Sequence, residues 1–163
     1  MELSDLTHDD LCSIAFKYLR NNGFGVAFHD KFKACTHSGE QPDAMGFRSG
    51  ASCLIECKRT RSDFLADRKK KFRIDPDLGM GDWRFMLAPK GLIKVDELPK
   101  GWGLLETDGK RVYKTHGWPG NAQWISDRPF IGSKINETAY MYSALRRMEI
   151  RGHLKDVYEG VPT

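Results

Sequence analysis

Two short runs of strand-forming residues, joined by one turn, constrain the fold of this chain most strongly. The runs cover residues 43–47 and 52–58, and Arg48-Ser49-Gly50 between them is a turn signal. This spacing predicts a hairpin. Glu56 and Lys58 are two residues apart, so on a strand their side chains point to the same face. If the first strand begins near Asp43, the hairpin brings all three functional groups to one edge of the sheet.

The remaining secondary structure is predicted from periodicity and breakers. Thr7 and Asp10 have the spacing of a capping box, and the apolar residues that follow repeat with helical spacing as far as Asn21-Asn22-Gly23. Residues 30–41 are predicted to be a loop, and residues 116–134 show no clear period. Further strands are expected at 24–28, 83–87, 102–105 and 112–113, and further helices at 62–72 and 136–151. The last helix is expected to carry an apolar stripe made by Tyr140 or Met141, Leu145 and Met148.

This order of elements predicts an α/β fold, with a central mixed sheet flanked by helices. The 163 residues are expected to form a single domain, residues 1–163, large enough for a core without disulfides. No apolar run reaches the length of a membrane span, and the acidic start lacks the order of a secretory signal. Four cysteines do not suggest a disulfide framework, so we expect a cytoplasmic protein.

Positive charge is concentrated directly behind the Glu-x-Lys element. Residues 58–73 contain eight basic and two acidic side chains, a net charge of +6, whereas the whole chain carries +4. A concentrated basic segment fits a polyanionic partner such as DNA, although a solvated helix face gives the same pattern. The basic residues that we expect to contact phosphates are Arg59, Arg61, Arg68, Lys69, Lys70 and Lys71.

Two sequence motifs and their surroundings resemble a known superfamily. Residues 41–44 (Gln-Pro-Asp-Ala) and 54–58 (Leu-Ile-Glu-Cys-Lys), followed by a predicted helix, resemble the PD-(D/E)XK nucleases, which have a restriction-endonuclease-like core. Residues 61–70 and 79–105 look similar to small phage and bacterial members related to DNA-repair nucleases. The resemblance implies a helix, a three-stranded meander, a crossing helix and a further strand, over roughly the first ninety residues.

The resemblance also implies roles for individual residues. Asp43 and Glu56 would coordinate Mg²⁺ or Mn²⁺, together with the backbone carbonyl of Cys57, since such hard cations prefer oxygen ligands. Lys58 would hold the attacking water or stabilise charge on the phosphate. Glu40 is a further candidate ligand. Each of these side chains taken singly also fits a turn, a loop charge or a solvent-facing strand pair.

Supporting roles fall to residues at two helix starts. His8, Asp9 and Asp10 begin the first helix, where some members of the superfamily place an additional acid, but charge near a helix N-terminus explains the two aspartates. Ser62 and Asp63 would cap the helix after the Glu-x-Lys strand or orient Lys58, capping being the favoured role.

The function implied is metal-dependent hydrolysis of DNA, double-stranded, single-stranded or branched, in bacterial or phage DNA processing or repair. If the chain is phage-encoded, the compartment is the host cytoplasm. Alternatives are a catalytically inactive nucleic-acid-binding protein and a protein-interaction role, such as inhibition of host defence, on the same fold. A homodimer is one possible oligomeric state, and the sequence does not decide it. A zinc site at Cys35 and His37, or at Cys53 and Cys57, is disfavoured, the last two being expected as small buried residues.

Overall fold

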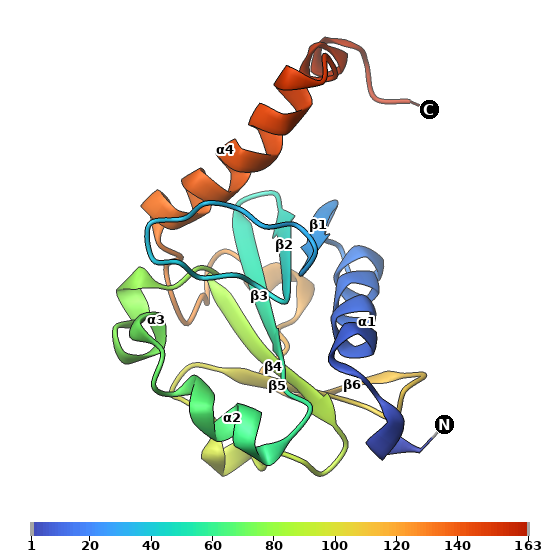
Figure 1. The fold of residues 1–163 in the computed structure, drawn as a ribbon, viewed down its shortest axis with the longest axis vertical. Helices are drawn as coiled ribbons and strands as arrows, with labels where there is room; N and C mark the ends of the chain where they lie inside the picture. The colour runs from blue at the N-terminus through green and yellow to red at the C-terminus, as the bar shows by residue number, and fades with distance from the viewer. Residues whose placement is uncertain (1, 163) are drawn as a thin grey trace.

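A six-stranded mixed sheet forms the centre of the molecule (Figure 1). The structure is a computed structural model and describes residues 2–162. The strands lie side by side in chain order. The first two pairings and the last are antiparallel, whereas β3–β4 and β4–β5 are parallel. The strands are β1 (Val26–His29), β2 (Ala44–Arg48), β3 (Ala51–Cys57), β4 (Trp83–Pro89), β5 (Gly103–Thr107) and β6 (Val112–His116).

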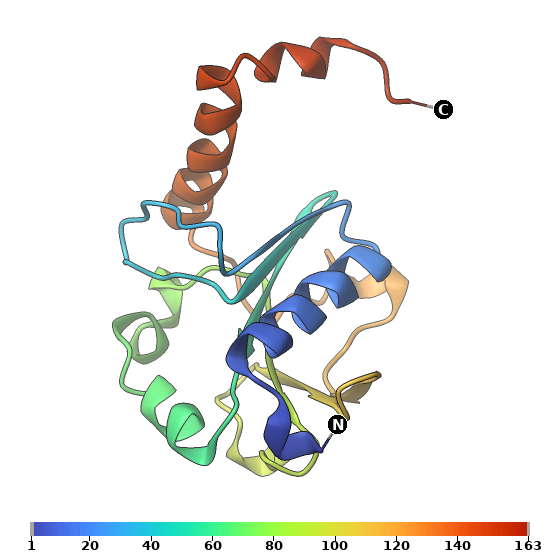
Figure 2. The same cartoon turned by 45° about the vertical axis from the view of Figure 1, so that its right-hand side comes forward.

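Helices cover both faces of this sheet, so the predicted α/β architecture is confirmed. Helix α1 (His8–Asn21) lies on one face, and the short helices α2 (Arg61–Asp67) and α3 (Lys71–Ile74) lie on the other (Figure 2). The segment that contains α2 and α3 is the crossover that two parallel strands require, here β3 and β4. Short 3₁₀ turns lie at Leu3–Asp5, Pro76–Leu78, Val95–Glu97, Asn121–Gln123 and Leu154–Tyr158.

Alternation along β3 divides the core into two layers. Cys53, Ile55 and Cys57 belong to the cluster that packs under α1, whereas Leu54 belongs to the cluster on the other face. All seven residues of β3 are buried, as expected for a central strand covered on both faces. Glu56 is two residues after Leu54, so its side chain points to the same face of the sheet as Leu54. Its carboxylate therefore lies in the layer beneath α2 and α3.

The N-terminus of α1 forms as predicted. The Asp10 N–H donates to Thr7 Oγ1 at 3.0 Å, and the Thr7 N–H donates to Asp10 Oδ2 at 2.9 Å, which completes the capping box. Cys53 and Cys57 are buried, as expected. Among the described residues, no helix combines the length and apolar character needed to cross a bilayer.

The predicted helix over residues 62–72 is wrong in one respect. Two short helices replace it, because Lys70 adopts an extended backbone conformation (φ −66°, ψ 140°) that interrupts the helix. The cap is also different. Thr60, rather than Ser62 or Asp63, accepts the N–H of Asp63 at 3.1 Å, so the capping role predicted for Ser62 and Asp63 is corrected.

Helix α4 (Lys134–Ile150) extends beyond the sheet and leaves the body of the molecule along most of its length (Figures 1 and 2). Tyr140 is completely buried, whereas Leu145 and Met148, which share the predicted apolar stripe, are 51% and 43% exposed. The stripe is therefore a core contact only near its start.

Candidate functional site

Asp43 lies immediately before β2 and is fixed against the end of β3. The register pairs Ala44 with Ile55, so the next position outward sets Asp43 opposite Glu56. The Cys57 N–H donates to Asp43 Oδ2 at 2.8 Å. One carboxylate oxygen is therefore used to hold the strand ends together, and the other, Oδ1, faces His8 Nε2 at 3.3 Å.

Glu56 is a buried carboxylate surrounded by cations. Its Oε1 lies 3.2 Å from a guanidinium nitrogen of Arg73, and its Oε2 lies 3.9 Å from Lys58 Nζ and 4.0 Å from Lys70 Nζ. Burial and, secondly, the negative charge of Asp43 raise the pKa of Glu56 to about 8, although the three cations act in the opposite direction. The two predicted metal ligands are thus close enough for their charges to interact.

Lys58 follows β3 by one residue and is held by an acid that the sequence analysis did not select. Its Nζ donates to Asp67 Oδ1 at 2.8 Å, and both side chains are almost completely buried. Burial alone would raise the pKa of Asp67, but the charges of Arg73 and Lys58 and the hydrogen bond from Lys58 outweigh burial and lower it. Asp67 at the end of α2 therefore fixes the position of the Lys58 amine.

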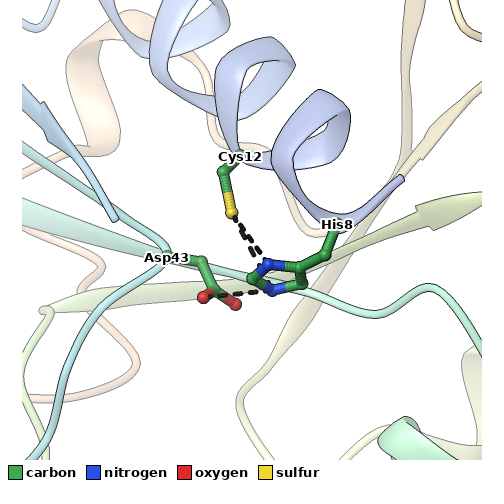
Figure 3. A group of neighbouring side chains, drawn as sticks. All are labelled: His8, Cys12 and Asp43. Atoms are coloured by element: carbon green, nitrogen blue, oxygen red, sulfur yellow. Dashed lines mark hydrogen bonds and ion pairs between the residues drawn. The ribbon is translucent and has the colours of Figure 1, made fainter. Parts of the chain in front are cut away.

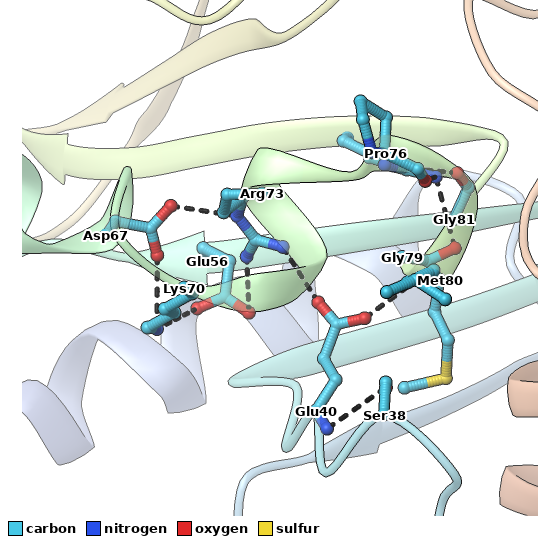
Figure 4. Close-up of polar contacts among 12 residues, drawn as sticks. Ser38, Glu40, Glu56, Asp67, Lys70, Arg73, Pro76, Gly79, Met80 and Gly81 are labelled. Atoms are coloured by element: carbon cyan, nitrogen blue, oxygen red, sulfur yellow. Dashed lines mark hydrogen bonds and ion pairs between the residues drawn. The ribbon is translucent and has the colours of Figure 1, made fainter.

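Arg73 joins three acids into one network (Figure 4). Its guanidinium donates to Asp67 Oδ2 at 2.8 Å and to Glu40 Oε2 at 2.9 Å, and it also faces Glu56. The other oxygen of Glu40 accepts the Met80 N–H at 2.9 Å. Glu40, a candidate metal ligand by sequence, is therefore 1% exposed with both oxygens occupied, and its role here is to support the network.

A cavity of about 480 Å³ opens at this edge of the sheet. Asp43, Glu56 and Lys58 all line it, so the structure brings the three residues of the predicted constellation to one site. The remaining lining residues come from α1, from the end of β3 and the chain next to β2 and β3, and from α2 and the turn after it: His8, Gln41, Cys57, Arg59, Asp63, Ala66, Asp67 and Lys70.

The basic segment divides into paired and free side chains. Arg61 forms a bidentate pair with Glu97, with both distances 2.7 Å, and Lys70 approaches Asp67 at 3.1 Å. These two cations therefore have structural partners. The exposed basic residues of this segment for which no ion pair is found among the described residues are Arg59, Arg68, Lys69 and Lys71.

Asp67 and Arg73 are the site residues that sequence reasoning missed. Asp67 is one of the two acids in the basic segment. A lysine that is buried at a strand end, as Lys58 is, needs an acidic partner. That requirement was the available signal. Arg73 gave no comparable signal, because its contacts depend on the break between α2 and α3.

Comparisons with known proteins give information about the fold of this chain only. No family model matches the chain, and no curated protein sequence matches it. A solved structure of a protein of unknown function from Silicibacter pomeroyi superposes with a TM-score of 0.59 at 24% identity, and the match covers 98% of this chain and 99% of that one. The likeness therefore extends over the whole architecture and assigns no activity.

Proposed function

We propose that this protein is a divalent-metal-dependent DNA nuclease of the PD-(D/E)XK type, which hydrolyses phosphodiester bonds. The observation that supports this most is the shared cavity: Asp43, Glu56 and Lys58 come from two adjacent strand ends and line one opening. Two carboxylates and an amine that line one cavity match the chemistry of cleaving a phosphate ester.

The donor set fits Mg²⁺ or Mn²⁺. Asp43 Oδ1 and the Glu56 carboxylate are hard oxygen donors, and the backbone carbonyl of Cys57 lies at the same strand end. Burial and the charge of Asp43 together raise the pKa of Glu56 to about 8, so a cation bound between the two acids would relieve unfavourable negative charge. Bound there, the metal would lower the pKa of its water and polarise the scissile phosphate.

The protein's own residues would hold the Glu56 carboxylate and the Lys58 amine in position and would stabilise charge on the phosphate. Asp67 holds the Lys58 amine 3.9 Å from Glu56 Oε2, where the ammonium would stabilise charge on the oxygens of a phosphate bound beside Glu56. Arg73 fixes the Glu56 carboxylate from the opposite side and is itself held by Glu40. The network therefore limits the motion of both Glu56 and Lys58 before substrate arrives.

DNA is the proposed partner because exposed cations line the cavity or neighbour its lining residues along the chain. Arg59 lines the cavity, and Arg68, Lys69 and Lys71 follow on the adjacent helical segment without an ion pair among the described residues. Such side chains give affinity that is independent of sequence and falls with salt. We place the protein in the cytoplasm, or in the host cytoplasm if it is phage-encoded, as an endonuclease in DNA processing or repair.

The test is cleavage of supercoiled, linear, single-stranded and branched DNA with Mg²⁺, Mn²⁺ or EDTA. Asp43→Asn and Glu56→Gln keep the size of each side chain and remove a metal-binding charge. Asp96→Asn, in the 3₁₀ turn at Val95–Glu97 where Asp96 is exposed, is the matched control. Metal-dependent cutting that is lost in both site variants and kept in the control supports the proposal.

A second candidate is a nucleic-acid-binding protein without catalysis. One observation favours it: Glu56 faces Arg73 at 3.2 Å and Lys58 is bonded to Asp67, so both groups already have partners in the protein. DNA binding that depends on salt, with no cutting in any metal, would select this candidate.

A further inference from the structure

Three potential metal ligands of different chemistry meet beside the cavity, on the α1 side (Figure 3). His8 and Cys12 are four residues apart on α1, so they lie on one face of the helix, one turn from each other. Asp43 approaches from the start of β2. The ligand atoms of the three residues all lie within 4.8 Å of one another.

The separations match a tetrahedral zinc site. With Zn–S of about 2.3 Å and Zn–N or Zn–O of about 2.0 Å, tetrahedral angles place ligand atoms roughly 3.3–3.6 Å apart. His8 Nε2 lies 3.3 Å from Asp43 Oδ1 and 3.8 Å from Cys12 Sγ. The sulfur lies slightly closer to His8 Nδ1, at 3.6 Å, so the half-exposed imidazole would have to turn for Nε2 to face an ion shared with Cys12. Small side-chain movements would therefore suffice to enclose an ion.

The three residues also differ in burial in a way that suits such a site. Cys12 is 1% exposed, so its sulfur lies beneath the surface, whereas the His8 side chain is 47% exposed and leaves a path from solvent. Asp43 contributes the oxygen that its hydrogen bond with Cys57 leaves free. Three protein ligands leave one position open for water, as in many zinc sites that are not purely structural.

The geometry points to a zinc-binding site made by His8, Cys12 and Asp43, distinct from the magnesium site but sharing one ligand with it. Sulfur and imidazole favour Zn²⁺ over Mg²⁺. Because Asp43 would serve both sites, bound zinc withdraws a ligand from the proposed catalytic metal and inhibits cleavage. Zinc binding depends only on these three residues, and the inhibition rests on the proposed nuclease function.

The first test is titration of the metal-free protein with Co²⁺, a spectroscopic substitute for zinc. The wild type is expected to show a thiolate-to-cobalt charge-transfer band that stoichiometric Zn²⁺ removes. His8→Gln and Cys12→Ser should lose the band or bind at least about tenfold more weakly, since each removes a direct ligand and the loss of even an outer-shell partner typically costs about 10–100-fold. His8 is half exposed, so its variant keeps the fold even if the Cys12 variant does not.

Cys35→Ser is the matched control, because Cys35 is an exposed cysteine outside the cluster. Absence of the band in the wild type, or its loss in Cys35→Ser with retention in Cys12→Ser, overturns the site. The second test is Mg²⁺-dependent cleavage with added Zn²⁺, where His8→Gln should need about tenfold more zinc for half inhibition. A normal cobalt band without any cleavage refutes the nuclease and leaves the zinc site standing.

Discussion

Replacing Asp67 by Asn isolates the part of the site that the fold adds to the sequence motif. Asp67 is 1% exposed and bonds two cations at 2.8 Å, Lys58 and Arg73, whose side chains are 6% and 3% exposed. The substitution keeps the size of the side chain and one acceptor oxygen, but removes the negative charge that these buried cations face.

The expected loss of stability follows from these contacts. Removing one partner of a buried ion pair costs about 3–5 kcal/mol, because the remaining charge stays buried. Arg73 still faces Glu40 and Glu56, so the cost should fall at the lower end, about 3 kcal/mol. With a urea m-value of about 2 kcal/mol/M, the unfolding midpoint should fall by about 1.5 M at pH 7.

The pH dependence has a definite sign. Since the folded-state pKa of Asp67 is lowered, its stabilising contribution is present above the unfolded pKa of about 3.9 and is lost as pH falls through the folded value. The difference between wild type and Asp67→Asn should therefore be constant near neutrality and shrink below about pH 4.

Asp96→Asn is the control for Asp67→Asn. Asp96 is exposed and has no side-chain hydrogen bond or ion pair among residues 2–162, so Asp96→Asn should change stability by less than about 0.5 kcal/mol. If Asp67→Asn loses less than about 1 kcal/mol, or no more than the control, the network does not hold Lys58 as described.

Three further predictions concern packing, metal and DNA. A Cβ at Gly103 would clash with the Phe85 ring and would lie 2.6 Å from the carbonyl oxygen of His116, so Gly103→Ala should lower the free energy of unfolding by about 2 kcal/mol or more, seen as a lower thermal midpoint. Gly25→Ala, where an added Cβ meets nothing within 4 Å, should be neutral or stabilising. Protons compete with metal at Glu56, whose pKa burial raises to about 8, so calorimetric Mg²⁺ affinity should increase with pH up to about 8 and level off above it; a flat profile contradicts this role. Lys69→Ala should reduce the slope of log affinity against log salt for duplex DNA by about 1, and an unchanged slope removes Lys69 from the phosphate contacts.

The hairpin at the site was predictable because its signals are local. Period-two alternation sets Glu56 and Lys58 on one face, and the turn between the strands sets the register that brings Asp43 opposite. Both features depend on neighbours within about fifteen residues. The capping box of Thr7 and Asp10 was predictable for the same reason.

The supporting network was not predictable because it depends on distant residues and on an interrupted helix. Nothing in the composition of residues 68–70 requires the extended backbone at Lys70, and without that break Arg73 would not turn back toward Asp67 and Glu56. The burial of the apolar stripe on α4 was also only partly predictable. Periodicity shows that one helix face is apolar, but not which part of that face the body covers, and only Tyr140 is buried in the core.

The most direct test of the central claim is the single-turnover rate of Mg²⁺-dependent plasmid cleavage by wild type and Lys58→Met. Methionine keeps the unbranched shape and removes the ammonium, while Arg73 and Lys70 still neutralise Asp67. The account predicts that EDTA abolishes wild-type cleavage and that Lys58→Met, folded and still able to bind Mg²⁺, is slower by about 10²–10³-fold. Equal rates for the two proteins, or no metal-dependent cleavage by the wild type, would contradict it.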